Sequence, residues 1–133
     1  MIVVDASIIA NALADDGVDG AIARHALGQD PELAAPDLVD VETVSVLRRR
    51  WLAGDLTARR FRAAITDLAD LDLTRHPTLP FMPRAYELRA NVTPYDAVYI
   101  GLAETLACSL LTADARLANS PGPRCAIHVV RSR

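Results

Sequence analysis

Four acidic side chains stand where an α/β protein would keep its catalytic groups: Asp5, Glu42, Asp96 and Asp114. Asp5 directly follows an apolar, β-branched run that is typical of a buried strand, and Asp114 follows a second apolar run. Glu42 and Asp96 each lie in the first turns of a predicted helix. In a parallel sheet, strand ends and the helix beginnings that follow them share one edge. We therefore expect the four carboxylates to meet there.

Four carboxylates at one edge would repel one another unless a cation lies between them. Oxygen ligands without His or Cys suit a hard ion such as Mg²⁺ or Mn²⁺. One or two such ions could hold a phosphodiester, lower the pKa of a bound water and stabilise the leaving oxygen. Ser7 and Thr112 stand beside two of the carboxylates, and their hydroxyls are expected to support the ligands or the phosphate.

Helix electrostatics offers a simpler explanation for some of these residues. Asp5 could cap the helix that follows it. Asp37, Asp40 and Glu42 together suit the positive end of a helix dipole. Asp96 is different, because the helix that begins at Pro94 is apolar nearly all round and must be buried. A carboxylate in its first turn would be costly without partners or a metal.

Short strands alternate with helices along the sequence, which predicts an α/β sandwich with a parallel sheet. Strand-like or extended segments are expected at residues 2–4, 32–36, 71–74, 109–112 and 126–130. Helices are expected at residues 8–14, 18–28, 38–53, 58–71 and 81–91, with a further helix that begins at Pro94 and includes Glu104 and a short helix that begins near Asp114.

Residues 1–133 are expected to form one domain, with a globular composition and a net charge of −3. All 14 basic residues are Arg, whose planar fork can bond two phosphate oxygens at once. Two Arg clusters, at 48–50 and 59–62, are either a solvated helix face or phosphate contacts. The N-terminus does not resemble a secretory signal, and no apolar run approaches the roughly 20 residues of a membrane span. We therefore expect a cytoplasmic protein without a membrane partner.

The sequence has two cysteines, Cys108 and Cys125, which are too few for a disulfide framework and do not have the spacing of a zinc site. Free thiols are the expected state in the cytosol. Both lie near predicted strand starts, so a bridge between neighbouring strands remains open.

The sequence resembles the PIN-domain ribonucleases, and among them the VapC-type toxins of bacterial toxin–antitoxin pairs. The resemblance covers essentially the whole chain. Its most specific parts are Tyr95-Asp96-Ala97 and Thr112-Ala113-Asp114, in that order near the C-terminus. It rests on four stretches: Met1–Ser7, Glu42 in its helix, Pro94–Tyr99 and Leu111–Leu117.

This resemblance implies a PIN-like three-layer α/β/α sandwich with a central parallel sheet, and an endoribonuclease that depends on Mg²⁺ or Mn²⁺. It also implies a homodimer, neutralised in a hetero-oligomer by a small antitoxin whose C-terminal tail lies over the active-site groove. The metal-binding and catalytic roles carry over to the matching quartet, Asp5, Glu42, Asp96 and Asp114. Some members carry a further acidic residue shortly after the fourth. Here residues 116–119 contain no carboxylate, which leaves a second metal site open.

Two other α/β families place an Asp after the first strand. Haloacid-dehalogenase-like phosphatases need a second Asp two residues later, where this chain has Ser7, and both they and response-regulator receivers rely on a Lys that this chain lacks. The remaining alternative is a PIN-like module that binds RNA or a partner without cleaving.

Overall fold

Five parallel strands form one sheet in the computed structural model, which describes residues 1–132. Their order across the sheet is β3-β2-β1-β4-β5. The central strand is covered on both faces, since Val3 and Val4 are fully buried, as its apolar sequence predicted. The strands are β1 (Ile2–Val4), β2 (Leu33–Pro36), β3 (Thr74–His76), β4 (Ser109–Thr112) and β5 (Ile127–Val129).

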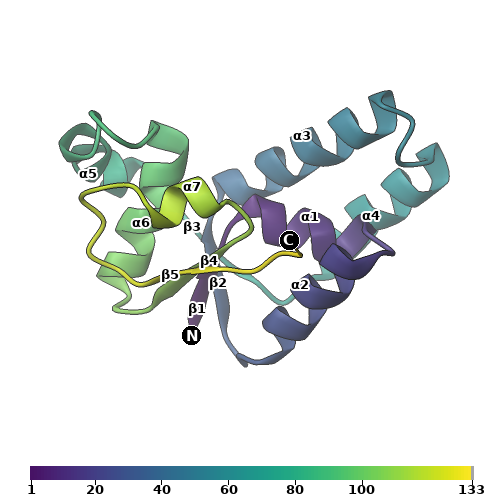
Figure 1. Cartoon of the computed structure of the whole chain (residues 1–133), viewed down its shortest axis with the longest axis horizontal. Coiled ribbons are helices and arrows are strands. Elements are labelled where there is room, and N and C mark those ends of the chain that lie inside the picture. The colour runs from purple at the N-terminus through teal and green to yellow at the C-terminus, as the bar shows by residue number, and fades with distance from the viewer. Residues whose placement is uncertain (133) are drawn as a thin grey trace.

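Helices lie on both sides of this sheet, so the expected three-layer α/β/α sandwich is confirmed (Figure 1). Helices α5 and α6 cover one side, and α1 to α4 lie on the other, where α3 and α4 form a long hairpin (Figure 1). The helices are α1 (Ala6–Ala14), α2 (Val18–Gly28), α3 (Leu38–Leu52), α4 (Ala58–Asp70), the 3₁₀ helix η1 (Leu79–Phe81), α5 (Met82–Glu87), α6 (Pro94–Thr105) and α7 (Ala115–Ala118).

Helix α6 forms the centre of one layer. Thr93 accepts a hydrogen bond from the Asp96 N–H and Pro94 occupies the first helical position, so the sequence signals for its beginning are confirmed. The seven residues from Ala97 to Ala103 are all buried, and the helix packs across β1, β2 and β4. The first turn of α6 is thereby fixed against the sheet.

The strand order reverses between β1 and β4. The chain runs from β1 outward to β2 and β3, and then returns to the other side of β1 for β4 and β5. Open α/β sheets bind ligands in the crevice at the carboxyl ends of the strands where such a reversal occurs. The register pairs Val4 with Leu111, so Asp5 and Thr112 leave neighbouring strands side by side.

Some local predictions were wrong. The segment at 71–74 is not a strand: Leu71 caps the end of α4, Leu73 is buried in the core, and β3 begins only at Thr74. The alternation of Leu residues therefore came from core packing. Helix α5 ends at Glu87 instead of 91, and Ile65, expected in the core stripe of α4, is 43% exposed.

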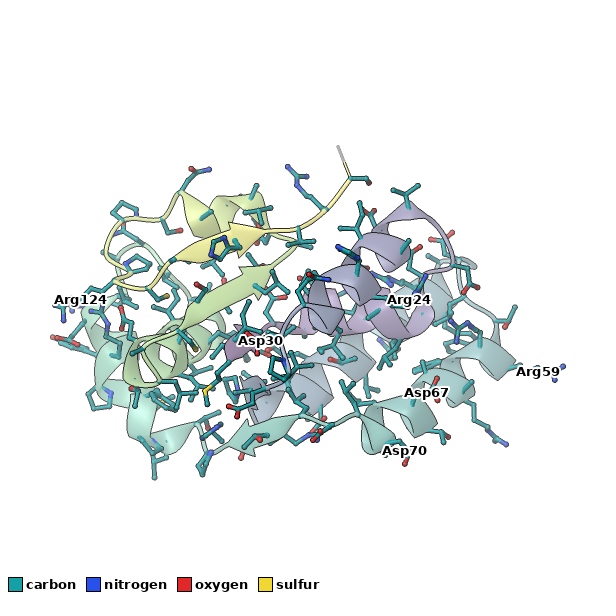
Figure 2. All side chains as sticks on the ribbon, turned by 90° about the horizontal axis from the view of Figure 1, so that it is seen from below. Arg24, Asp30, Arg59, Asp67, Asp70 and Arg124 are labelled. Atoms are coloured by element: carbon teal, nitrogen blue, oxygen red, sulfur yellow. The ribbon has the colours of Figure 1, made fainter. Side chains whose placement is uncertain are left out.

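The outer surface of α4 is highly charged. Figure 2 shows the side chains of Arg59, Asp67 and Asp70 pointing outward from this part of the chain. Both cysteines are free thiols, although continuing the β4–β5 register by two residues places Cys108 opposite Cys125. Within residues 1–132, no helix has the length and apolar character that a membrane span requires.

The contact between α1 and α2 depends on Gly20. A Cβ atom at this position would lie 1.7 Å from the backbone oxygen of Asp15, so the two helices would have to move apart. We predict that Gly20→Ala lowers the free energy of unfolding by about 1–3 kcal/mol. The matched control is Gly28→Ala, where a Cβ meets nothing within 4 Å, and its stability should be unchanged or slightly raised. Equal urea midpoints for the two variants would contradict this packing.

Candidate active site

A cavity of about 220 Å³ opens at the carboxyl ends of β1 and β4. Four separate elements bring its acidic groups together: Asp5 precedes α1, Glu42 comes from α3, Asp96 from the first turn of α6, and Asp114 precedes α7. Ser7 also lines the cavity, whereas Thr112 is fully buried behind it. All four carboxylates selected from the sequence therefore line one cavity.

Asp5 is held by hydrogen bonds from both neighbouring strand ends. Its Oδ1 accepts from the Ser7 backbone N–H (3.0 Å), the Ser7 hydroxyl and the Ile8 N–H, and its Oδ2 accepts from the Thr112 hydroxyl. The two hydroxyls in turn accept from the N–H groups of Ala113 (3.1 Å) and Asp114 (3.0 Å). Burial nevertheless raises the pKa of Asp5, although these hydrogen bonds oppose the shift.

Glu42 is positioned by a tyrosine that the sequence reasoning did not select. The hydroxyl of Tyr99 donates to Glu42 Oε1 at 2.7 Å, and the tyrosine is only 2% exposed. Burial raises the pKa of Glu42, and the charges of Asp96 and Asp5 raise it further. A sequence signal was present, because Tyr99 stands one helical turn after Asp96 and so shares its face of α6.

Asp96 and Asp114 differ in their electrostatics. Burial raises the pKa of Asp96, and the nearby charge of Asp114 adds to the effect. The pKa of Asp114 is lowered, chiefly because Arg116 donates hydrogen bonds from its side chain. Arg116 Nε lies 3.2 Å from Oδ1 and Nη2 lies 3.0 Å from Oδ2, while the arginine itself is almost fully exposed.

The donor set fits a hard divalent cation. All the groups are oxygen ligands. Burial raises the pKa of three of the four carboxyls, and neighbouring acidic charges add to the rise for Glu42 and Asp96. Among residues 1–132, however, no three His, Cys, Asp or Glu side chains are gathered closely enough to hold an ion as they stand. Glu42 and Asp114 instead face Tyr99 and Arg116. Forming a coordination shell would require these side chains to rearrange.

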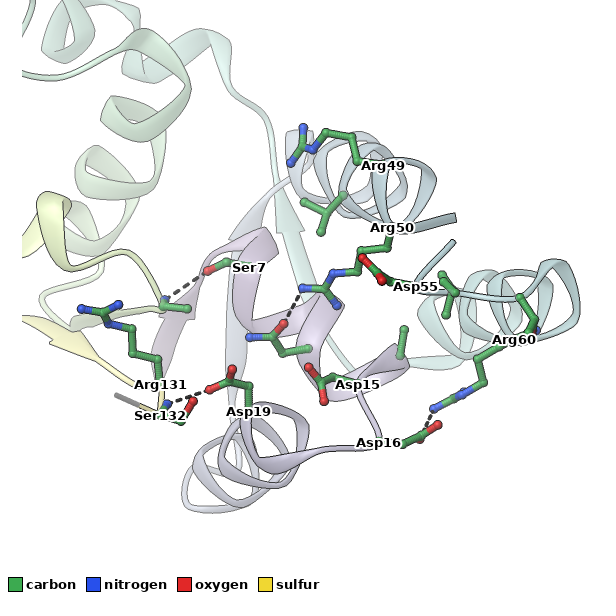
Figure 3. Close-up of a pocket in the computed structure, with 16 residues that line it drawn as sticks. Ser7, Asp15, Asp16, Asp19, Arg49, Arg50, Asp55, Arg60, Arg131 and Ser132 are labelled. Carbon is green, nitrogen blue, oxygen red and sulfur yellow. Dashed lines mark hydrogen bonds and ion pairs between the residues drawn. The ribbon is translucent and has the colours of Figure 1, made fainter. Parts of the chain in front are cut away.

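A larger cavity of about 1010 Å³ adjoins the acidic one and shares Ser7, Val46 and Arg49 with it. Figure 3 shows the arginines and aspartates of this larger cavity. They belong to α2, α3 and α4, to the connections that follow α1 and α3, and to the C-terminal segment. Two of the arginines have side-chain partners here: Arg60 pairs with Asp16 at 3.1 Å, and Arg50 donates to the side chain of Asn11.

Comparisons with known proteins agree with this architecture. A PIN domain family model matches residues 2–122. Ribonuclease VapC9 of Mycobacterium tuberculosis is 42% identical over 130 residues, covering 98% of each chain. Ribonuclease VapC1 of the same organism is 40% identical over 130 residues, covering 97% of each chain.

Solved structures share the fold at low identity. Mycobacterium tuberculosis VapC20, described as a toxin that cleaves the sarcin-ricin loop, gives a TM-score of 0.66 at 17% identity, covering 83% of this chain and 87% of that one. VapBC2 from Rickettsia felis, solved with a promoter DNA fragment, gives a TM-score of 0.67 at 13% identity, covering 98% of this chain and 99% of that one.

Sheet and cavity together define an α/β domain with an acidic site at its topological switch point. With the family model and the relatives at 40–42% identity, the chain belongs to the PIN-domain family, among the VapC-type ribonucleases.

Burial of the Asp96 carboxylate, together with the charge of Asp114, predicts a pH-dependent gain in stability for Asp96→Asn. Because the pKa of Asp96 is raised in the folded protein, its ionisation destabilises the fold as pH rises above the unfolded value of about 3.9. In metal-free buffer the variant should match wild type below that pH and melt a few degrees higher at pH 7.

Asp114→Asn is the matched control, because the pKa of Asp114 is lowered and its ionised form stabilises the fold above about pH 4. This variant should show no gain and a small loss at pH 7. A metal-free Asp96→Asn protein that melts below wild type at pH 7 would contradict the electrostatic account.

Proposed function

We propose that this protein is a metal-dependent endoribonuclease that acts as the toxin of a toxin–antitoxin pair and cleaves cellular RNA. One observation carries the proposal: the four carboxylates, which are far apart in the sequence, line a single cavity at the switch point of the sheet. The proposal is supported by relatives that are named ribonucleases and match over almost the full chain.

Asp5, Glu42, Asp96 and Asp114 would hold Mg²⁺ or Mn²⁺. Such an ion supplies an acidified water and neutralises charge on the phosphate. Ser7 and Thr112 keep the Asp5 carboxylate in one orientation. Glu42, with its raised pKa and its orientation fixed by Tyr99, is suited to accept the proton of the attacking water. The water oxygen would bond to phosphorus as a phosphorus–ribose oxygen bond breaks, and the leaving ribose oxygen would take a proton from solvent.

A protein partner is the second part of the proposal: the chain forms a homodimer and is neutralised in a hetero-oligomer by its antitoxin. Large apolar side chains exposed on neighbouring elements support such contacts, because an exposed apolar patch is typical of a protein interface. The α3–α4 hairpin presents Trp51 (45% exposed), Leu52 (58%) and Ile65 (43%). A second set, at η1, α5 and α6, comprises Leu79 (77%), Tyr86 (66%) and Tyr95 (61%).

The alternative is a PIN-like module that binds RNA or a partner without cleaving it. The observation in its favour is that Arg116 engages both carboxylate oxygens of Asp114. Cleavage by the purified protein separates the two functions.

Cleavage should depend on Asp96 and Glu42. We predict that Asp96→Asn and Glu42→Gln each reduce Mg²⁺-dependent cleavage of total cellular RNA by about 100-fold or more. Asp5→Asn is a less suitable test, because an amide N–H₂ would face the donors that now surround the carboxylate. Cleavage sites are mapped by sequencing RNA ends after incubation with each protein.

The control is Asp67→Asn, an exposed carboxylate on α4 away from the cavity (Figure 2). This variant should cleave like wild type. If wild type produces no metal-dependent ends, or if the Asp96 variant produces the same ends at the same rate, the protein is not the nuclease described above.

Metal should also stabilise the fold. A ligand that binds only the folded state raises the free energy of unfolding by about 2.7 kcal/mol when its concentration is 100 times its Kd. Mn²⁺ should therefore raise the melting temperature of wild type, and the rise should be much smaller for Asp96→Asn. Equal shifts in the two proteins would place the bound ion outside the acidic cavity.

A further inference from the structure

We infer that Arg49 binds an RNA backbone phosphate next to the one being cleaved. This inference rests on the proposed function. Arg49 is the one arginine among residues 1–132 that lines both the acidic cavity and the larger cavity beside it. It therefore stands at the passage through which a strand would leave the acidic site.

Helix geometry places Arg49 in line with the acidic group of α3. Glu42, Val46 and Arg49 follow each other at spacings of four and three residues, so they share one face of the helix, and all three line the acidic cavity. Seven residues correspond to about 10 Å along the axis. Long helical side chains lean toward the N-terminus, which brings the guanidinium back toward Glu42.

Arg49 has its charge available for a ligand. Its side chain makes no hydrogen bond or ion pair with another residue of the described chain, whereas its neighbour Arg50 donates to Asn11 and Arg60 pairs with Asp16. Figure 3 shows Arg49 at the rim of the larger cavity, with no dashed line to any neighbour.

The chemistry of the passage favours a phosphate. Four carboxylates repel an approaching polyanion, so a positive group beside them offsets part of that repulsion. A strand whose scissile phosphate occupies the acidic cavity must carry its neighbouring phosphates past the rim. Arg49 can bond two oxygens of one of these phosphates with its planar fork, without contacting any base. It would therefore act on all RNA sequences alike.

The test compares Arg49→Gln with Arg48→Gln, its neighbour on the same helix. Arg48 is also exposed but lines neither cavity, so it controls for the general loss of positive charge. Steady-state cleavage of a single-stranded RNA oligomer should show KM raised about tenfold by Arg49→Gln with little change in kcat. Arg48→Gln should leave both constants near wild type.

Salt dependence gives a readout that a structural defect would not produce. RNA binding is measured by fluorescence anisotropy with Mg²⁺, each Arg substitution being combined with Asp96→Asn to prevent cleavage. Loss of one phosphate contact should reduce the slope of log K against log salt by about 0.7 for single-stranded RNA. Arg49→Gln in the Asp96→Asn background should show this reduction relative to Asp96→Asn alone, and the single variant Arg49→Gln should keep the melting temperature and Mn²⁺ shift of wild type.

Two results would overturn the inference. In one, wild type cleaves RNA and Arg49→Gln keeps the wild-type KM and salt slope. In the other, the two Arg variants weaken binding equally, which would indicate a diffuse surface charge. Failure of the proposed function looks different, because wild type itself would then produce no metal-dependent cleavage.

Discussion

Repulsion between four carboxylates in one half-buried cavity is the constraint on which the rest of the site depends. Burial raises the pKa values of Asp5, Glu42 and Asp96, and neighbouring acidic charges raise those of Glu42 and Asp96 further, so the fold works against the ionised forms. Local donors offset part of this cost. Three of the four acids lie at helix beginnings, where the N–H groups and the dipole favour negative charge. The residual negative charge is what a divalent ion would neutralise.

An apolar frame holds these charges in place. Fully buried residues of β1 and the buried body of α6 fix the two elements that carry Asp5 and Asp96. Two cross-strand hydrogen bonds then join the ends of β1 and β4: the Thr112 hydroxyl donates to Asp5, and the Ala113 N–H donates to the Ser7 hydroxyl. The site is buried where the strands end, whereas on its outer side Asp114 is half-buried and its partner Arg116 is 91% exposed. Stability and function therefore oppose each other in the same few residues.

Sequence reasoning predicted the central parts of this arrangement because they depend on short-range patterns. An apolar run followed by a carboxylate located Asp5, and the Thr93–Pro94 signal located the buried helix that carries Asp96. Partners chosen by tertiary packing were harder to find. Tyr99 and Arg49 belong to the site only because α6 and α3 turn those faces toward one cavity. The strand predicted at 71–74 failed for a related reason, since Leu73 packs in the core without joining the sheet. The catalytic roles of the quartet and the single-domain organisation of 1–133 stay predictions.

The most direct measurement of the central claim is the position of a bound ion. A crystal of the wild-type protein soaked in Mn²⁺ would be measured at the manganese absorption edge. The account predicts an anomalous peak in the acidic cavity, with oxygens of at least three of Asp5, Glu42, Asp96 and Asp114 within about 2.0–2.6 Å of the manganese. An empty cavity at millimolar Mn²⁺, or manganese bound only at other carboxylates, would contradict it.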